Sequence, residues 1–135
     1  AARGSHVVNL VSVAGTVAFA PAGAYSAAKH AQLAFSRSTA ALLRGSGIQV
    51  HTVMPGFVET EGFPQRTALR SRLLRRFIID ADRVGETIVD AVEKGKSEVT
   101  VPWFPYRFVS IAQALVPGLF AAFAGRAGYH RGEAR

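Results

Sequence analysis

The chain has 135 residues, 49% of them hydrophobic and 19% charged, which is typical of one globular domain and excludes a disordered chain. Its net charge is +7, but no helix-turn-helix pattern or aromatic-interleaved basic motif is present, so we expect a solvated basic surface and no nucleic-acid partner. The chain contains no cysteine, which excludes disulfides and thiolate chemistry, and its four histidines lack the spacing of metal ligands, so we expect no metal. The first residues show no signal-peptide pattern, and we expect a cytoplasmic protein.

The first half of the chain predicts a strand, a helix and a second strand. "HVVNLV" (6–11) is a short Val-rich run typical of a strand buried on both faces. The segment from about Ala24 to Leu43 contains no Gly or Pro and predicts a long helix that ends before Gly45. "IQVHTV" (48–53) predicts the second strand. This order is a βαβ unit, so the two strands are expected to be parallel.

The second half predicts one more helix and strand. The Arg-rich segment 61–80 is expected to be a substrate loop or lid. Asp82 is expected to cap a helix from Arg83 to about Lys94, with Val84, Ile88, Ala91 and Val92 along one face. "EVTV" (98–101) predicts a third strand, and residues 103–124 form an apolar tail.

A serine, a tyrosine and a lysine are the candidates for catalysis. Tyr25 and Lys29 are four residues apart at the start of the long predicted helix, so their side chains emerge on one face. Ser12 follows the first predicted strand, at the edge where open parallel sheets bind ligands. Its hydroxyl could bind a substrate carbonyl or alcohol oxygen that Tyr25 protonates or deprotonates.

The strength of the electrostatic effect supports this role. An unperturbed tyrosine has a pKa of about 10, and bringing it to about 7 takes roughly 4 kcal/mol. An ammonium about 4 Å from the phenol oxygen, at an effective dielectric constant of about 20, supplies about 4 kcal/mol. A lysine one helical turn away is therefore sufficient to make a tyrosine a working acid or base.

Three motifs together resemble the C-terminal half of a short-chain dehydrogenase/reductase. They are "NLVSVAG", "YSAAK" and "VMPGFVET", and the resemblance covers about residues 4–101. It implies a Rossmann-type doubly wound parallel sheet and an NAD(P)-dependent oxidoreductase that interconverts a secondary alcohol and a carbonyl. The choice between NAD and NADP is not readable from the sequence.

The resemblance also implies a role for each motif residue. Ser12 orients the substrate oxygen, and Tyr25 is the catalytic acid or base that also contacts the cofactor. Lys29 activates the tyrosine and hydrogen-bonds the nicotinamide ribose. The positions expected to line the nicotinamide end of the cofactor are Pro55, Gly56, Val58 and Thr60.

The family's first half has no counterpart in this sequence. The glycine-rich turn after the family's first strand and its Asn-Ala-Gly motif are missing. We therefore expect residues 1–102 to be the C-terminal half of the Rossmann-type domain, without the dinucleotide-binding N-terminal half and inactive alone. Residues 103–135 are expected to be an apolar and then basic extension.

Two rival interpretations come from other classes of protein. Ser26 and Lys29 fit the Ser-x-x-Lys of penicillin-recognising acyl-transferases, but the accompanying motifs of that class are missing. The arginines of segment 61–80, interleaved with Leu and Phe, and the apolar tail fit a membrane-surface module without catalysis. The tail could instead pack over the substrate cleft or against a partner subunit.

The expected partners follow from these interpretations. We expect a hydrophobic carbonyl or alcohol substrate, and peripheral membrane contact remains an alternative for the tail. Ala27, Ala28, Ala31 and Ala34 form a small-residue helix face that fits either core packing or a homodimer or homotetramer interface, which is common in the family.

Overall fold

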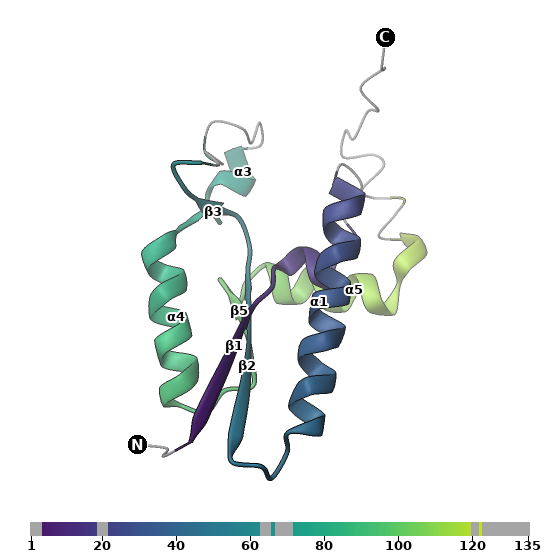
Figure 1. Cartoon of the computed structure of the whole chain (residues 1–135). Helices are drawn as coiled ribbons and strands as arrows, with labels where there is room; N and C mark the ends of the chain where they lie inside the picture. The colour runs from purple at the N-terminus through teal and green to yellow at the C-terminus, as the bar shows by residue number, and fades with distance from the viewer. Residues whose placement is uncertain (1–3, 19–21, 63–65, 67–71, 120–121, 123–135) are drawn as a thin grey trace.

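The computed structural model, which describes residues 4–18, 22–62, 66, 72–119 and 122, contains a three-stranded parallel sheet. Its strands are β1 (Ser5–Leu10), β2 (Ile48–Pro55) and β5 (Glu98–Val101), in the spatial order β1-β2-β5. The chain passes from β1 to β2 through α1 (Gly23–Leu42), and α4 (Ala81–Glu93) lies between β2 and β5. Figure 1 shows α1 and α4 on opposite sides of the sheet, which confirms the predicted α/β architecture.

The two longer strands differ in burial. β2 is central, and its last six residues are buried. β1 pairs with β2 in register, with Val8 opposite His51, but Val7 and Leu10 are 40% and 46% exposed. The prediction that this strand is buried on both faces is therefore wrong for the described residues. Burial of a Val-rich strand depends on its neighbours, and β1 has one strand neighbour in the part of the chain that is described.

α1 agrees with the predicted helix to within one residue at each end. Its sequence is rich in Ala and Leu and free of interior breakers, which favours a long helix. In the turn after it, Gly45 and Gly47 have φ values of 84° and 83°. Only glycine adopts this left-handed backbone without strain, so these residues allow the chain to return to β2.

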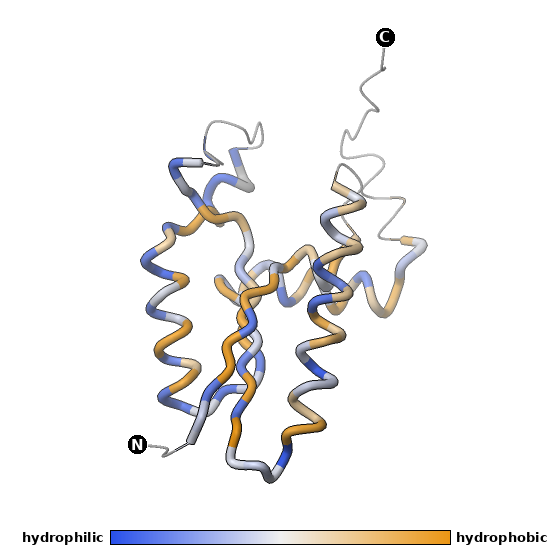
Figure 2. Tube along the Cα trace, viewed as in Figure 1, coloured by the Kyte–Doolittle hydropathy of each residue, from blue (hydrophilic) through white to orange (hydrophobic). Residues whose placement is uncertain are grey.

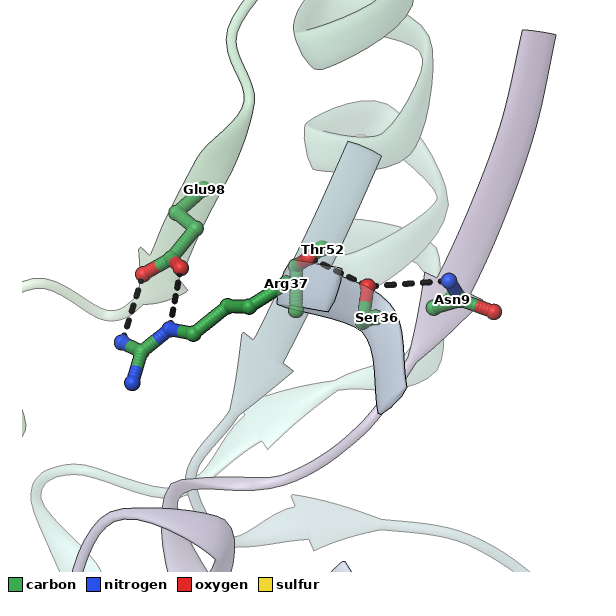
Figure 3. Close-up of polar contacts among 5 residues, drawn as sticks. All are labelled: Asn9, Ser36, Arg37, Thr52 and Glu98. Atoms are coloured by element: carbon green, nitrogen blue, oxygen red, sulfur yellow. Dashed lines mark hydrogen bonds and ion pairs between the residues drawn. The ribbon is translucent and has the colours of Figure 1, made fainter. Parts of the chain in front are cut away.

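Two sets of polar contacts hold α1 against the sheet (Figure 3). Ser36 Oγ lies 2.9 Å from Asn9 Nδ2 and 2.7 Å from Thr52 Oγ1, so one buried hydroxyl joins α1 to β1 and β2. Arg37 donates hydrogen bonds of 2.6 and 3.0 Å to the Glu98 carboxylate of β5. These bonds lower the pKa of Glu98, so the pair's contribution to stability is lost as the pH falls through that lowered pKa.

The Ser36 contact predicts a measurable loss of stability. Ser36→Ala removes the shared partner of Asn9 and Thr52, and Thr52 is itself only 2% exposed. We expect the free energy of unfolding to fall by about 1–3 kcal/mol, since a buried hydroxyl loses its hydrogen bond. Urea unfolding followed by circular dichroism measures the change. Ser38→Ala, on the exposed side of the same helix, is the control and should be nearly neutral.

A second, two-stranded parallel pair leads into α4. It consists of β3 (Val58–Glu59) and β4 (Ile79–Asp80). Asp80 is the N-cap residue of α4 and Asp82 lies in its first turn, so the prediction that Asp82 caps this helix is wrong. The Asp80 carboxylate makes no capping hydrogen bond and accepts one from Arg66 at 3.0 Å.

The predicted apolar stripe of α4 is confirmed. Val84 and Ala91 are buried, and Ile88 and Val92 are half-buried. Figure 2 shows apolar and hydrophilic residues recurring along this helix. α4 therefore covers one side of the sheet, and its polar side faces solvent.

The predicted substrate loop and tail are described only in part. α3 (Arg72–Arg75) is a single helical turn within segment 61–80. Residues 63–65 and 67–71 of this segment, and 120–121 and 123–135 of the tail, lie outside the described residues.

α5 (Tyr106–Leu115) is a helix that was not predicted from the sequence. Its buried Tyr106 packs with Val13 and Val17 in an apolar cluster. Ser110 Oγ and Thr16 Oγ1 are 2.6 Å apart, which adds a polar contact between α5 and the segment after β1. Among the helices that the structure describes, none combines the length and apolar composition needed to cross a bilayer.

Candidate active site

Ser12 stands at the carboxyl end of β1. Val11 continues the pairing of β1 with β2, since its N–H donates to Val53 O at 2.9 Å. Ser12 then caps the short 3-10 helix η1 (Val13–Gly15), and its Oγ accepts a hydrogen bond from Ala14 N at 3.1 Å. The bond to Ala14 uses one lone pair, so the hydroxyl proton of Ser12 can donate to a ligand oxygen.

Tyr25 and Lys29 lie one turn apart at the start of α1. Lys29 Nζ is 5.7 Å from the centroid of the Tyr25 ring, so the i, i+4 spacing does bring the two side chains together. The Tyr25 side chain is accessible, since the residue is 50% exposed. Lys29 is half-buried, and its Nζ donates to Gln32 Oε1 at 2.8 Å.

A close backbone approach joins the serine segment to the lysine turn. Gly15 ends η1, and a Cβ placed on it would lie 2.7 Å from Lys29 O. Only glycine allows so short a separation between η1 and α1. The structure therefore places the turn that carries Lys29 directly against the turn that begins at Ser12.

The segment "PGFVET" follows the carboxyl end of β2. Because β1 and β2 are parallel neighbours, this segment and Ser12 lie at the same edge of the sheet. Pro55 is buried and Gly56 N donates to Val101 O at 2.9 Å, while Val58 pairs with Ile79 in the β3–β4 ladder. Thr60 is exposed and borders a surface hollow. The hollow is lined by Glu59, Thr60, Glu61, Gly62 and Ala81.

Comparison with known proteins identifies the family. A family model described as short chain dehydrogenase matches residues 1–70, which is more than half of the chain. The chain belongs to the short-chain dehydrogenase family. The three motifs "NLVSVAG", "YSAAK" and "VMPGFVET" all fall within the matched residues.

Two curated relatives and one solved structure are similar to this short-chain dehydrogenase chain. The 1-deoxy-11-beta-hydroxypentalenate dehydrogenase of Streptomyces exfoliatus is 41% identical over 50% of this chain and 25% of its own length. An uncharacterized oxidoreductase of Myxococcus xanthus is 31% identical over 90% of this chain and 46% of its own length. The chain thus spans less than half of either relative.

The solved structure is a short-chain dehydrogenase from Burkholderia cenocepacia in complex with NADP. It shares 22% identity, with a TM-score of 0.69, and the match covers 90% of this chain and 47% of that chain. This likeness confirms the Rossmann-type fold of this part of a short-chain dehydrogenase.

Two residues that surround the site, Gly15 and Gln32, were not predicted as site residues. Gly15 is required by a close approach that only the folded structure reveals, and a close approach also explains the glycine at position 56, which was already predicted to line the cofactor. Gln32 contacts Lys29, and the feature of the sequence that could have revealed this contact is a polar residue three positions after the lysine. Tyr106, by contrast, is buried in the cluster with Val13 and Val17, and burial raises the pKa of its phenol, so it is a neutral, structural tyrosine.

The rival acyl-transferase interpretation is disfavoured by burial. Ser26, the nucleophile that interpretation requires, is only 4% exposed. An acyl donor therefore cannot reach its hydroxyl without moving α1. Among the residues that the structure describes, no group of three or more His, Asp or Glu side chains could hold a metal ion.

Proposed function

We propose that the complete protein is an NAD(P)-dependent oxidoreductase that interconverts a secondary alcohol and a carbonyl. The observation that carries this proposal is the contact between Gly15 and the backbone of Lys29. This contact supports the proposal because it joins the turn that begins at Ser12 to the turn of α1 that carries Lys29, and the exposed Tyr25 lies one turn before Lys29.

Each side chain has one task in the proposed reaction. Ser12 donates a hydrogen bond that orients the substrate oxygen, and Tyr25 gives the proton to that oxygen during reduction or takes it during oxidation. The ammonium of Lys29 stabilises the resulting phenolate by its charge. The cofactor supplies or accepts the hydride at the substrate carbon.

The residues of this chain fit the nicotinamide end of the cofactor. Lys29 has three N–H donors and uses one of them on Gln32, which leaves two for the ribose hydroxyls. Pro55, Gly56, Val58 and Thr60 follow β2 at the same sheet edge and are proposed to line the nicotinamide. A glycine-rich turn that could hold the pyrophosphate is not part of these 135 residues.

The surroundings of the site favour a hydrophobic substrate. α5 packs against the segment that follows Ser12, through Tyr106 and the Ser110–Thr16 contact. Several large apolar residues within α5 or next to it are exposed, with exposed fractions of 46% to 76%. These are Trp103, Phe104, Phe108, Ile111, Leu115, Val116 and Leu119.

Oxidation of the reduced cofactor by the complete protein tests this function. NADH and NADPH are each offered with ketones of increasing chain length, and the absorbance of the reduced nicotinamide is followed. We expect turnover with one cofactor and a kcat/KM that increases with chain length. A complete protein that binds the cofactor but reduces no ketone and oxidises no secondary alcohol would contradict the proposal.

The isolated chain is expected to behave differently. Residues 1–135 alone should bind neither NADH nor NADPH with micromolar affinity, because the pyrophosphate contributes much of the binding and this sequence contains no glycine-rich turn of the kind that binds it. Isothermal titration calorimetry measures this directly. Micromolar binding to the isolated chain would refute the expectation.

A subunit interface on α1 is proposed for the complete protein. Ala27, Ala28, Ala31 and Ala34 are exposed, whereas the core-facing residues of this helix include Leu33 and Ser36. Packing among the described residues therefore does not account for the small-residue face, and we propose a homodimer or homotetramer. Analytical ultracentrifugation of the complete protein, with Ala31→Glu as the variant, distinguishes an oligomer from a monomer.

Contact with an anionic membrane is a second proposed role for the apolar surface near α5. Residues 99–119 contain no acidic side chain, and Arg107 lies among exposed aromatic residues. Sedimentation with anionic and with neutral vesicles tests this role in the complete protein. Loss of anionic-vesicle binding in Phe108→Asp supports it, and equal sedimentation of wild type and variant contradicts it.

A further inference from the structure

We propose that Gln32 is a positioning residue that holds the ammonium of Lys29 at the carboxyl end of β1. This inference deepens the proposed function and rests on it. Gln32 Oε1 accepts from Lys29 Nζ at 2.8 Å, and Gln32 Nε2 donates to Leu10 O at 3.1 Å. A single amide therefore joins the lysine to the last residue of β1.

The hydrogen bond from Gln32 to Leu10 O distinguishes this arrangement from an ordinary side-chain contact along a helix. An i, i+3 pair such as Lys29 and Gln32 is common on helix surfaces and fixes nothing outside the helix. The carbonyl of Leu10, however, belongs to a strand 22 residues away and lies two residues before Ser12. The amide thus holds the Lys29 side chain at a fixed position relative to β1, the strand that leads into Ser12.

A neighbouring contact of the same kind provides a comparison. Ser36 lies one turn after Gln32 on α1 and binds Asn9, the residue before Leu10. Both side chains therefore fasten α1 to β1, on consecutive turns. Among the contacts of the described residues, Gln32 is also bonded to Lys29 and Ser36 is not. Gln32 can therefore be tested as a positioning residue, with Ser36 as a purely structural control.

A neutral amide suits this role better than a carboxylate. It accepts a hydrogen bond from the ammonium without cancelling its positive charge, so the charge remains available to the phenolate of Tyr25. Residues 4–18 and 22–42, which include β1, η1 and α1, contain no acidic side chain; their ionisable groups besides Tyr25 and Lys29 are His6, His30 and Arg37. Gln32→Glu would place a negative charge next to this lysine.

The kinetic test compares three variants in the complete protein. Gln32→Met removes both hydrogen bonds while keeping similar volume, and we expect kcat/KM to fall by about 10- to 100-fold, with a higher KM for the cofactor. Gln32→Glu keeps the shape, and we expect the pH profile of kcat to move to higher pH, because a carboxylate disfavours the phenolate. Ser36→Ala, the matched control, should lower stability but keep the wild-type pH profile.

A chemical test is independent of turnover. The rate at which acetic anhydride acetylates Lys29 is measured by mass spectrometry, with Lys94 and Lys96 of the same molecules as internal references. These two lysines bind Asp90, far from the substitution in the sequence. We expect Gln32→Met to raise the relative rate at Lys29 several-fold and to leave the two references unchanged.

The outcomes separate this inference from the proposed function. An unchanged acetylation rate and pH profile in the Gln32 variants would overturn the positioning role, and so would a Ser36→Ala profile shifted in the same way as that of Gln32→Glu. If the wild-type protein is inactive with every substrate but Lys29 acetylation responds as expected, the positioning of Lys29 stands and the proposed function fails.

Discussion

Tyr25→Phe is expected to lower kcat of the complete protein by about 100- to 10,000-fold, the usual contribution of a positioned acid or base. The phenylalanine keeps the ring beside Lys29 but cannot exchange a proton with the substrate oxygen. Cofactor affinity should change little, since the ribose contacts proposed for Lys29 remain. Steady-state kinetics gives kcat, and fluorescence titration with NADH or NADPH gives the affinity.

The buried tyrosine is the matched control for this substitution. Tyr106 Oη lies 3.4 Å from Phe57 N and 3.5 Å from Phe77 O, and no proposed substrate contact involves it. Tyr106→Phe should reduce stability and leave kcat within about threefold of the wild type, because a weak structural hydrogen bond has no part in the transition state. Wild-type turnover in Tyr25→Phe would refute the role of Tyr25.

Gly56→Ala is expected to lower the free energy of unfolding by about 1–3 kcal/mol or more, through overpacking. A Cβ on Gly56 would overlap the ring of Tyr106. That ring cannot move aside easily, because Tyr106 is buried in the cluster with Val13 and Val17. Urea unfolding of the wild type and the variant measures the loss.

Two further variants sharpen this test. Gly62→Ala is the control, since a Cβ there meets nothing within 4 Å, and it should be nearly neutral. Combining Gly56→Ala with Tyr106→Leu should cost less than the sum of the two single changes, because the smaller side chain relieves the overlap. Equal stability of wild type and Gly56→Ala would contradict the close packing described here.

The sequence predicted those elements whose signals are local. The long helix α1 has good helix formers throughout and glycines after its end, and the predicted boundaries were correct to one residue. The parallel arrangement of β1 and β2 followed from the helix between them. The stripe of α4 followed from the spacing of Val84, Ile88 and Ala91.

The errors concern features that depend on distant residues. β1 resembles a fully buried strand in composition, but its exposure is decided by which strands lie beside it. Asp80 and Asp82 are both acceptable caps by residue type, so the sequence alone does not choose between them. α5 was missed because it lies in a largely apolar tail and prolines flank it, although Arg107, Ser110 and Gln113 recur within it at helical spacing.

In the candidate site, too, local features were predicted and features that depend on distant residues were not. The spacing of Tyr25 and Lys29 predicted that their side chains would meet, as they do. The contact of Gly15 with Lys29 O and the bond of Gln32 to Leu10 O join segments far apart in the sequence, so no local pattern could reveal them. The roles assigned to Ser12, Tyr25 and Lys29 remain predictions.

The most direct test asks whether Tyr25 and Lys29 act as one unit in proton transfer. At saturating cofactor, kcat of the complete protein is measured for Tyr25→Phe, for Lys29→Ala and for the double variant. If the lysine acts through the tyrosine, the double variant should be slower than Tyr25→Phe by no more than about threefold. Two large single losses that multiply in the double variant would show that the residues act independently and would contradict the account.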